Sequence, residues 1–109
     1  DVLVPDLAGW RTERITSEPA APYPTLAPDW ICEVSSPSTE AIDRTKKLKI
    51  YARERVGHAW LIAPLLQTLE VLRPAGPGWA LLAKHEGGAR VRAEPFQAVE
   101  LELGRVWST

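Results

Sequence analysis

The fold of this chain is decided by the stretch from residue 30 to residue 63, which begins with WICEV (30–34) and ends with HAWLIA (58–63). Both runs are short and apolar, as in strands that are covered on both faces. Between them, hydroxyl residues suited to a helix N-cap precede a predicted helix over residues 40–55, which stops near Gly57. Strand, helix and strand in this order predict a right-handed crossover between parallel neighbours.

The flanking segments extend this central unit. The pattern predicts a short strand from Val2 to Leu7 and a proline-rich irregular connection over residues 9–28. Thr68 to Arg73 and Trp79 to His85 predict a hairpin, and Ala98 to Leu103 alternates as a final strand. The expected fold class is therefore α/β, with a mixed β-sheet and one dominant helix crossing it.

Length and composition indicate one globular domain. The chain has 109 residues, of which 45% are hydrophobic and 25% charged, and a domain usually holds about 100–200 residues. No apolar stretch approaches the ~18 residues of a membrane span, and the first residues given lack the basic and apolar regions of a signal peptide. We expect a soluble, cytoplasmic protein. Since the chain contains no methionine and opens on a predicted strand, we read residues 1–109 as a single domain that lacks an N-terminal region.

Charge is unevenly distributed along the chain, although the net charge is only −1. Residues 1–38 hold two basic and six acidic side chains, whereas residues 39–56 hold six basic and three acidic ones. Acid on the strands beside base on the helix is what a cation site next to a phosphate-binding surface requires. A solvated helix face explains the basic residues equally well.

Asp6 and Glu33 are the candidate metal ligands. Side chains alternate along a strand, so Glu33 shares a face with Ile31, where an ionised carboxylate is costly unless it is paired or bound to a metal. If the strand of Asp6 is its neighbour, the two acids have the oxygen ligands that Mg²⁺ prefers. The alternatives are a turn stabilised by Asp6 after Pro5 and a buried ion pair at Glu33.

Lys47 is the candidate catalytic cation. Asp43, Lys47 and Tyr51 are spaced i, i+4 and i+8, which aligns them along one side of the predicted helix. From there Lys47 can activate water or stabilise charge on a phosphate, with Asp43 and Tyr51 as supporting residues. An ordinary surface pair between Asp43 and Lys47, worth about 0.3–0.5 kcal/mol, is the alternative.

Other reactive side chains fit a structural role better. Cys32 is the only cysteine and lies in a buried strand, where a core residue is expected rather than a nucleophile. His58 and His85 lack the spacing of zinc ligands.

The ordered set of short motifs resembles the Uma-two family of bacterial restriction-endonuclease homologues, within the PD-(D/E)XK nuclease superfamily. The resemblance covers nearly the whole chain and rests on Pro5-Asp6-Leu7, Pro28-Asp29-Trp30 through Glu33-Val34, Ser36-Pro37-Ser38-Thr39, Asp43, Lys47 and Tyr51, and Val56-Gly57 with Trp60-Leu61-Ile62. It implies a restriction-endonuclease-like fold, with Asp6 and Glu33 as the metal-binding acids.

Two positions depart from the family pattern. Ser35 stands where the superfamily's Glu-x-Lys motif has its lysine, so the resemblance implies that Lys47 on the helix takes that role. Ala63 stands before Pro64, where the family commonly has an aspartate.

The expected function is a metal-dependent endonuclease that hydrolyses phosphodiester bonds in DNA, with Mg²⁺ or Mn²⁺ as cofactor and Asp6, Glu33 and Lys47 as catalytic residues. The alternative is a non-catalytic module that keeps the nuclease fold for dimerisation or nucleic-acid binding. We expect DNA as the partner, no membrane, and a homodimer as the assembly to test.

Overall fold

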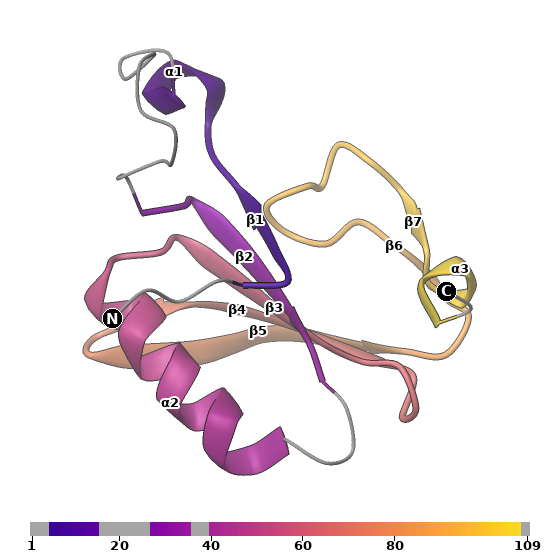
Figure 1. Ribbon diagram of the computed structural model, residues 1–109. Helices are drawn as coiled ribbons and strands as arrows, with labels where there is room; N and C mark the ends of the chain where they lie inside the picture. The colour runs from indigo at the N-terminus through magenta and orange to yellow at the C-terminus, as the bar shows by residue number, and fades with distance from the viewer. Residues whose placement is uncertain (1–4, 16–26, 36–39, 108–109) are drawn as a thin grey trace.

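A five-stranded mixed sheet carrying one long helix forms the body of the protein in the computed structural model, which describes residues 5–15, 27–35 and 40–107 (Figure 1). The strands lie side by side in chain order. They are β1 (Leu7–Gly9), β2 (Trp30–Val34), β3 (His58–Ala63), β4 (Thr68–Ala75) and β5 (Gly78–Glu86). The helix α2 (Glu40–Arg53) lies across one face of this sheet.

The central unit is confirmed. Strands β2 and β3 pair in parallel, with Glu33 opposite Leu61, and α2 connects them. The helix ends two residues earlier than predicted, and Arg55 after it has a φ of 62°. A left-handed residue of this kind is a common way to terminate a helix.

The first strand differs from the prediction of Val2 to Leu7. Residues 2–4 lie outside the described part, and β1 begins only at Leu7, pairing antiparallel with β2 from Leu7 opposite Cys32. Pro5 has no N–H to contribute to a ladder, which favours a later start. Asp6 therefore lies just before the strand instead of inside it. The connection that follows also contains a short helix, α1 (Thr12–Ile15).

The C-terminal half confirms the hairpin and corrects the last strand. β4 and β5 pair antiparallel around a tight turn with Gly76 at φ 57°. Of the strand predicted over Ala98 to Leu103, only β7 (Leu101–Glu102) forms, and it pairs with β6 (Arg90–Val91) in a separate two-stranded sheet. The helix α3 (Leu103–Trp107) follows, because burial of Leu103 against the main sheet outweighs the alternating pattern.

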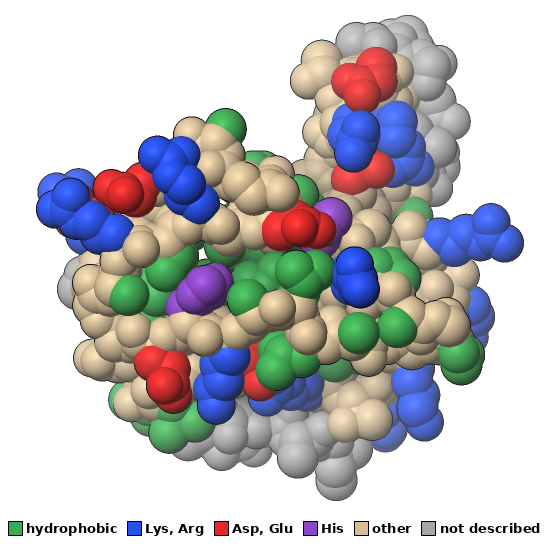
Figure 2. Space-filling view, turned by 180° about the vertical axis from the view of Figure 1, so that it is seen from behind, with side chains coloured by type: hydrophobic (Ala, Val, Ile, Leu, Met, Phe, Trp, Pro, Cys, Tyr) green, Lys and Arg blue, Asp and Glu red, His purple; other side chains and the backbone are tan. Residues whose placement is uncertain are grey.

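Two apolar clusters lie on opposite faces of the sheet. Under α2, the cluster contains Tyr51 and the strand residues Ile31 and Leu61. On the other face, Cys32 and Trp60 pack with Leu103 of α3. Figure 2 views the molecule from behind and shows hydrophobic side chains gathered along the middle, with charged side chains around them. Both faces of the central strands are thus covered, as their apolar sequences require.

No helix in the described part of the chain has the length and apolar character needed to cross a membrane.

Candidate active site

Glu33 lies on the same sheet face as Ile31, as strand alternation predicted, and the structure places α2 over this face. Its side chain is only 13% exposed. The ammonium of Lys47 lies 3.0 Å from Glu33 Oε1, and the Tyr51 hydroxyl donates a hydrogen bond of 2.6 Å to Oε2. Both partners come from the helix, so α2 determines where the carboxylate points. The buried ion pair that sequence offered as an alternative for Glu33 is therefore present, and it involves the predicted catalytic lysine.

Asp43 belongs to α2, but its side chain lies outside the described part of the structure. Its supporting role and its surface pairing with Lys47 stay predictions. Tyr51, the other supporting residue, is 4% exposed and contacts Glu33 directly.

Asp6 lies at the end of β2. Its Oδ2 accepts a hydrogen bond of 2.7 Å from the backbone N–H of Val34, the residue after Glu33. Because Leu7 pairs with Cys32 in an antiparallel ladder, continuing the register by one step places Asp6 opposite Glu33. The two acids are thus cross-strand neighbours, although Asp6 lies one residue before β1 begins.

The charges of both acids affect the pKa of the Cys32 thiol. Burial is the main cause that raises its pKa to about 12, and the negative charges of Asp6 and Glu33 raise it further. Cys32 itself is fully buried and remains a thiol, which confirms the interpretation of this residue as core.

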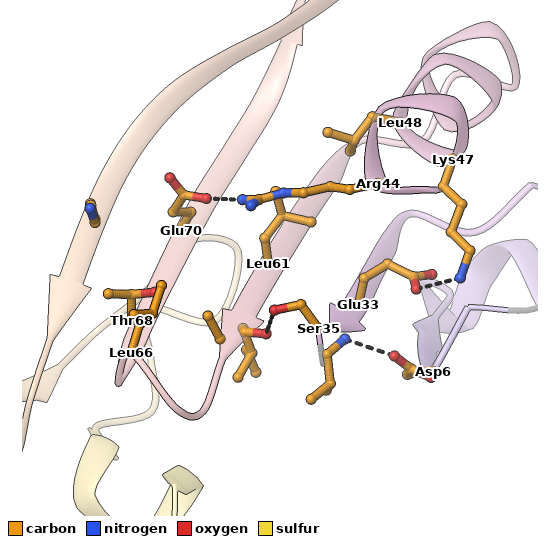
Figure 3. Close-up of a pocket in the computed structure, with 14 residues that line it drawn as sticks. Asp6, Glu33, Ser35, Arg44, Lys47, Leu48, Leu61, Leu66, Thr68 and Glu70 are labelled. Carbon is orange, nitrogen blue, oxygen red and sulfur yellow. Dashed lines mark hydrogen bonds and ion pairs between the residues drawn. The ribbon is translucent and has the colours of Figure 1, made fainter. Parts of the chain in front are cut away.

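Asp6, Glu33 and Lys47 line one pocket of about 360 Å³. It lies at the carboxyl ends of β2 and β3, where open α/β sheets usually bind their ligands. Figure 3 shows Lys47 reaching from α2 toward Glu33, with Asp6 beside the end of the strand. Ser35 and Ala63 also line the pocket. The structure therefore brings the three predicted catalytic residues together.

Three further charged residues of this pocket were missed from sequence. They are Arg44, Glu70 and Lys84. Arg44 forms an ion pair with Glu70. In the register of β4 with β5, Glu70 lies opposite Lys84. A signal was present: Glu70 interrupts the apolar run around Leu69 and Val71 in the same way that Glu33 interrupts its own strand.

The donor set fits a hard divalent cation. Among the described residues, no group of three or more His, Cys, Asp or Glu side chains gathers as a metal cage. Mg²⁺ does not need one, since it keeps several waters and binds through one or two carboxylates plus substrate phosphate. A carboxylate has about four acceptor sites, so Glu33 with two hydrogen bonds and Asp6 with one retain free lone pairs.

The histidines do not join this site. His58 Nε2 lies 2.7 Å from Glu94 Oε2, at the opposite end of β3. His85 lies opposite Leu69 in the pairing of β4 with β5 and does not line the pocket.

Comparisons with known proteins agree with this fold. Among solved structures, the chain is similar to one described as "a putative nuclease belonging to DUF820" from Anabaena variabilis, with 28% identity and a TM-score of 0.57. The match covers 76% of this chain and 45% of that one, so this chain spans less than half of that protein's length. None of the curated proteins matches. The similarity confirms the expected nuclease-like α/β fold class.

The family model Uma2, described as "Putative restriction endonuclease", matches residues 1–104. Because this match spans nearly the whole chain, the family expected from the motifs is confirmed, and the chain belongs to the Uma2 family.

Proposed function

We propose that this chain carries the catalytic site of a metal-dependent endonuclease that hydrolyses phosphodiester bonds in DNA. One observation carries the proposal: Asp6, Glu33 and Lys47 line the same pocket at the carboxyl ends of the parallel strands. Two acids beside a cation match the needs of phosphoryl chemistry, in which positioning and electrostatic stabilisation supply most of the rate. Membership in a family described as restriction endonucleases supports the same reaction class.

Asp6 and Glu33 are the residues that would hold Mg²⁺ or Mn²⁺. Such an ion, when bound, supplies a Lewis acid for the phosphoryl oxygen and lowers the pKa of water. The backbone N–H of Val34 orients Asp6, while Lys47 and Tyr51 orient Glu33. In this proposal the Lys47 ammonium also stabilises negative charge on the phosphate and helps to orient the attacking water.

DNA as substrate is supported by the charge of the helix beside the pocket. Arg44 and Lys47 line the pocket, and Lys46 and Lys49 are exposed on the same helix. A phosphate backbone attracts such a cluster in a salt-dependent way.

The test is nicking of supercoiled plasmid in Mg²⁺, in Mn²⁺ and in EDTA. We expect cleavage that needs the metal and falls by about 10²-fold or more in Glu33→Gln and Asp6→Asn. Glu86→Gln is the matched control, because this exposed carboxylate on β5 does not line the pocket. Cleavage that persists in EDTA, or that survives both pocket substitutions, would contradict the proposal.

A second candidate is a non-catalytic module that uses the nuclease fold for dimerisation or nucleic-acid binding. Ala63 favours it, because this pocket-lining residue stands where the family resemblance implies an aspartate. This module would bind DNA equally well in EDTA and in Mg²⁺ and would cleave none. Sedimentation of the protein would identify a homodimer.

A further inference from the structure

A second ion pair lies in the same pocket, beside the proposed catalytic one. The Arg44 guanidinium contacts the Glu70 carboxylate, whereas Lys47 contacts Glu33. Figure 3 shows the side chains of Arg44 and Lys47 extending from α2 toward the sheet. Leu61 lies between the carboxylates of Glu33 and Glu70 in this view. The proposed hydrolysis uses Glu33 and Lys47. Arg44 enters the proposed function only as one charge of the basic helix, and Glu70 has no part in it.

The two pairs differ in exposure. The side chains of Lys47 and Glu33 are 25% and 13% exposed, while those of Arg44 and Glu70 are 38% and 27% exposed. A pair that water reaches contributes little to stability, at most about 1 kcal/mol. Arg44 can therefore leave Glu70 at a small cost, because more than a third of its side-chain surface is already exposed.

Glu70 would not be left uncompensated by that movement. Glu33, Leu61, Glu70 and Lys84 are paired in register across four consecutive strands, so Lys84 lies directly opposite Glu70 on the same sheet face. Lys84 also lines the pocket. The carboxylate thus retains a neighbouring cation when Arg44 moves away.

We infer that Arg44 is a phosphate-binding residue of this pocket, which exchanges Glu70 for a backbone phosphate of the nucleic acid next to the one that is cleaved. The planar fork of a guanidinium binds two phosphate oxygens at once, which a lysine cannot do. In the free protein Glu70 holds the fork in the pocket and Lys84 takes over the carboxylate when substrate arrives. This inference rests on the proposed function, because it names a substrate contact of the same site.

Binding of a fluorescein-labelled DNA duplex in EDTA, followed by anisotropy over a series of salt concentrations, tests the inference without hydrolysis. We expect Arg44→Ala to weaken binding by about tenfold, as for the loss of one charge-assisted contact. The slope of log K against log salt should fall by about 0.9, the value for one phosphate. Arg44→Lys, which keeps the charge and the fold, should lose part of the affinity.

The matched control is Lys49→Ala, which removes one charge from an exposed position of the same helix outside the pocket. Glu70→Gln should tighten binding by about two- to fivefold, because Arg44 no longer has to leave a carboxylate. Glu86→Gln removes a similar charge outside the pocket and should have a smaller effect. If Arg44→Ala weakened binding no more than Lys49→Ala, or if Glu70→Gln weakened it, the inference would be wrong.

Kinetics separate this inference from the proposed function. Loss of a contact that is made equally in the ground and transition states raises KM and leaves kcat nearly unchanged. Arg44→Ala should behave in this way, whereas Glu33→Gln should lower kcat. Loss of cleavage in Glu33→Gln without any change of KM in Arg44→Ala would overturn the inference and leave the proposed function intact. If Arg44→Ala lost DNA affinity but neither the wild type nor any variant cleaved DNA, the inference would stand and the proposed function would be overturned.

Discussion

The Tyr51 hydroxyl donates a hydrogen bond of 2.6 Å to Glu33 Oε2, from a side chain that is only 4% exposed. Lys47, one helical turn before Tyr51, holds the other carboxylate oxygen at 3.0 Å. The orientation of Glu33 is thus set from α2 and does not depend on the strand alone. Since the aromatic ring of Tyr51 belongs to the apolar cluster beneath the helix, the site and the core share a residue.

Tyr51→Phe should therefore affect metal binding more than the fold. The ring stays in place, and loss of one hydrogen bond should lower the free energy of unfolding by about 1 kcal/mol. Residues that orient a metal ligand typically change affinity by about 10–100-fold, so Mn²⁺ binding measured by calorimetry should weaken at least tenfold. In a Glu33→Gln background the same substitution should have almost no effect on Mn²⁺. An equal effect in both backgrounds would show that Tyr51 does not act through Glu33.

Lys47→Ala should separate metal binding from catalysis. The ammonium competes with a cation for Glu33 Oε1, so its removal should leave Mn²⁺ affinity unchanged or tighter. Plasmid cleavage should nevertheless fall by about 10²-fold, because charge stabilisation on the phosphate is lost. Lys49→Ala provides the control for a lost helix charge. Unchanged cleavage in Lys47→Ala would refute the catalytic role of this lysine.

Sequence predicted Glu33, Lys47 and Tyr51 as members of one site because each periodicity is local. Strand alternation placed Glu33 on a covered face, and i, i+4 spacing placed Lys47 and Tyr51 on one side of the helix. The strand residue and the helix residues come together only if the helix crosses back over the strand. The second apolar run, at residues 58–63, indicated such a crossover because it predicted a parallel strand after the helix.

The parts that were missed depend on contacts between distant segments. Arg44 meets Glu70 only through the register of β3 with β4, which no local pattern encodes. The predicted final strand gave way to α3 because Leu103 is fully buried against the second apolar cluster. Tertiary burial of this kind routinely overrides local propensity.

Ala63→Asp should strengthen the metal site. Ala63 lies two residues beyond Leu61 on the same strand, so it shares the face of Glu33, and it lines the pocket. A third carboxylate there should tighten Mn²⁺ binding by about tenfold or more, since ligand charge tunes affinity in oxygen sites. Ala89→Asp adds the same charge at an exposed position outside the pocket and should leave calorimetric binding unchanged. Equal effects of the two variants would argue against a cation site at this end of the strands.

Gly57→Ala should destabilise the fold without touching the pocket. A Cβ at this position would lie 2.9 Å from the backbone carbonyl oxygen of Asp29, too close for the strands to stay in place. The same carbonyl accepts a hydrogen bond from the N–H of His58, so the join between β2 and β3 would have to shift. We expect a loss of about 1–3 kcal/mol in the free energy of unfolding by urea. Gly88→Ala, where a Cβ would meet no atom within 4 Å, should cost far less, and equal losses would contradict the steric argument.

Cys32 gives a pH-dependent test of the site's electrostatics. Burial, and then the charges of Asp6 and Glu33, raise the pKa of its thiol from 9.0 to about 12 in the folded state. Unfolding therefore releases a proton between those values, so the stability that the neutral thiol contributes is fully present below pH 9 and is lost progressively as the pH rises toward 12. Urea titrations over this range should show a smaller decline in Cys32→Ala. At neutral pH, iodoacetamide should label the unfolded chain but not the folded one. Rapid labelling of the folded protein would mean that Cys32 is not held as a buried thiol beside the two acids.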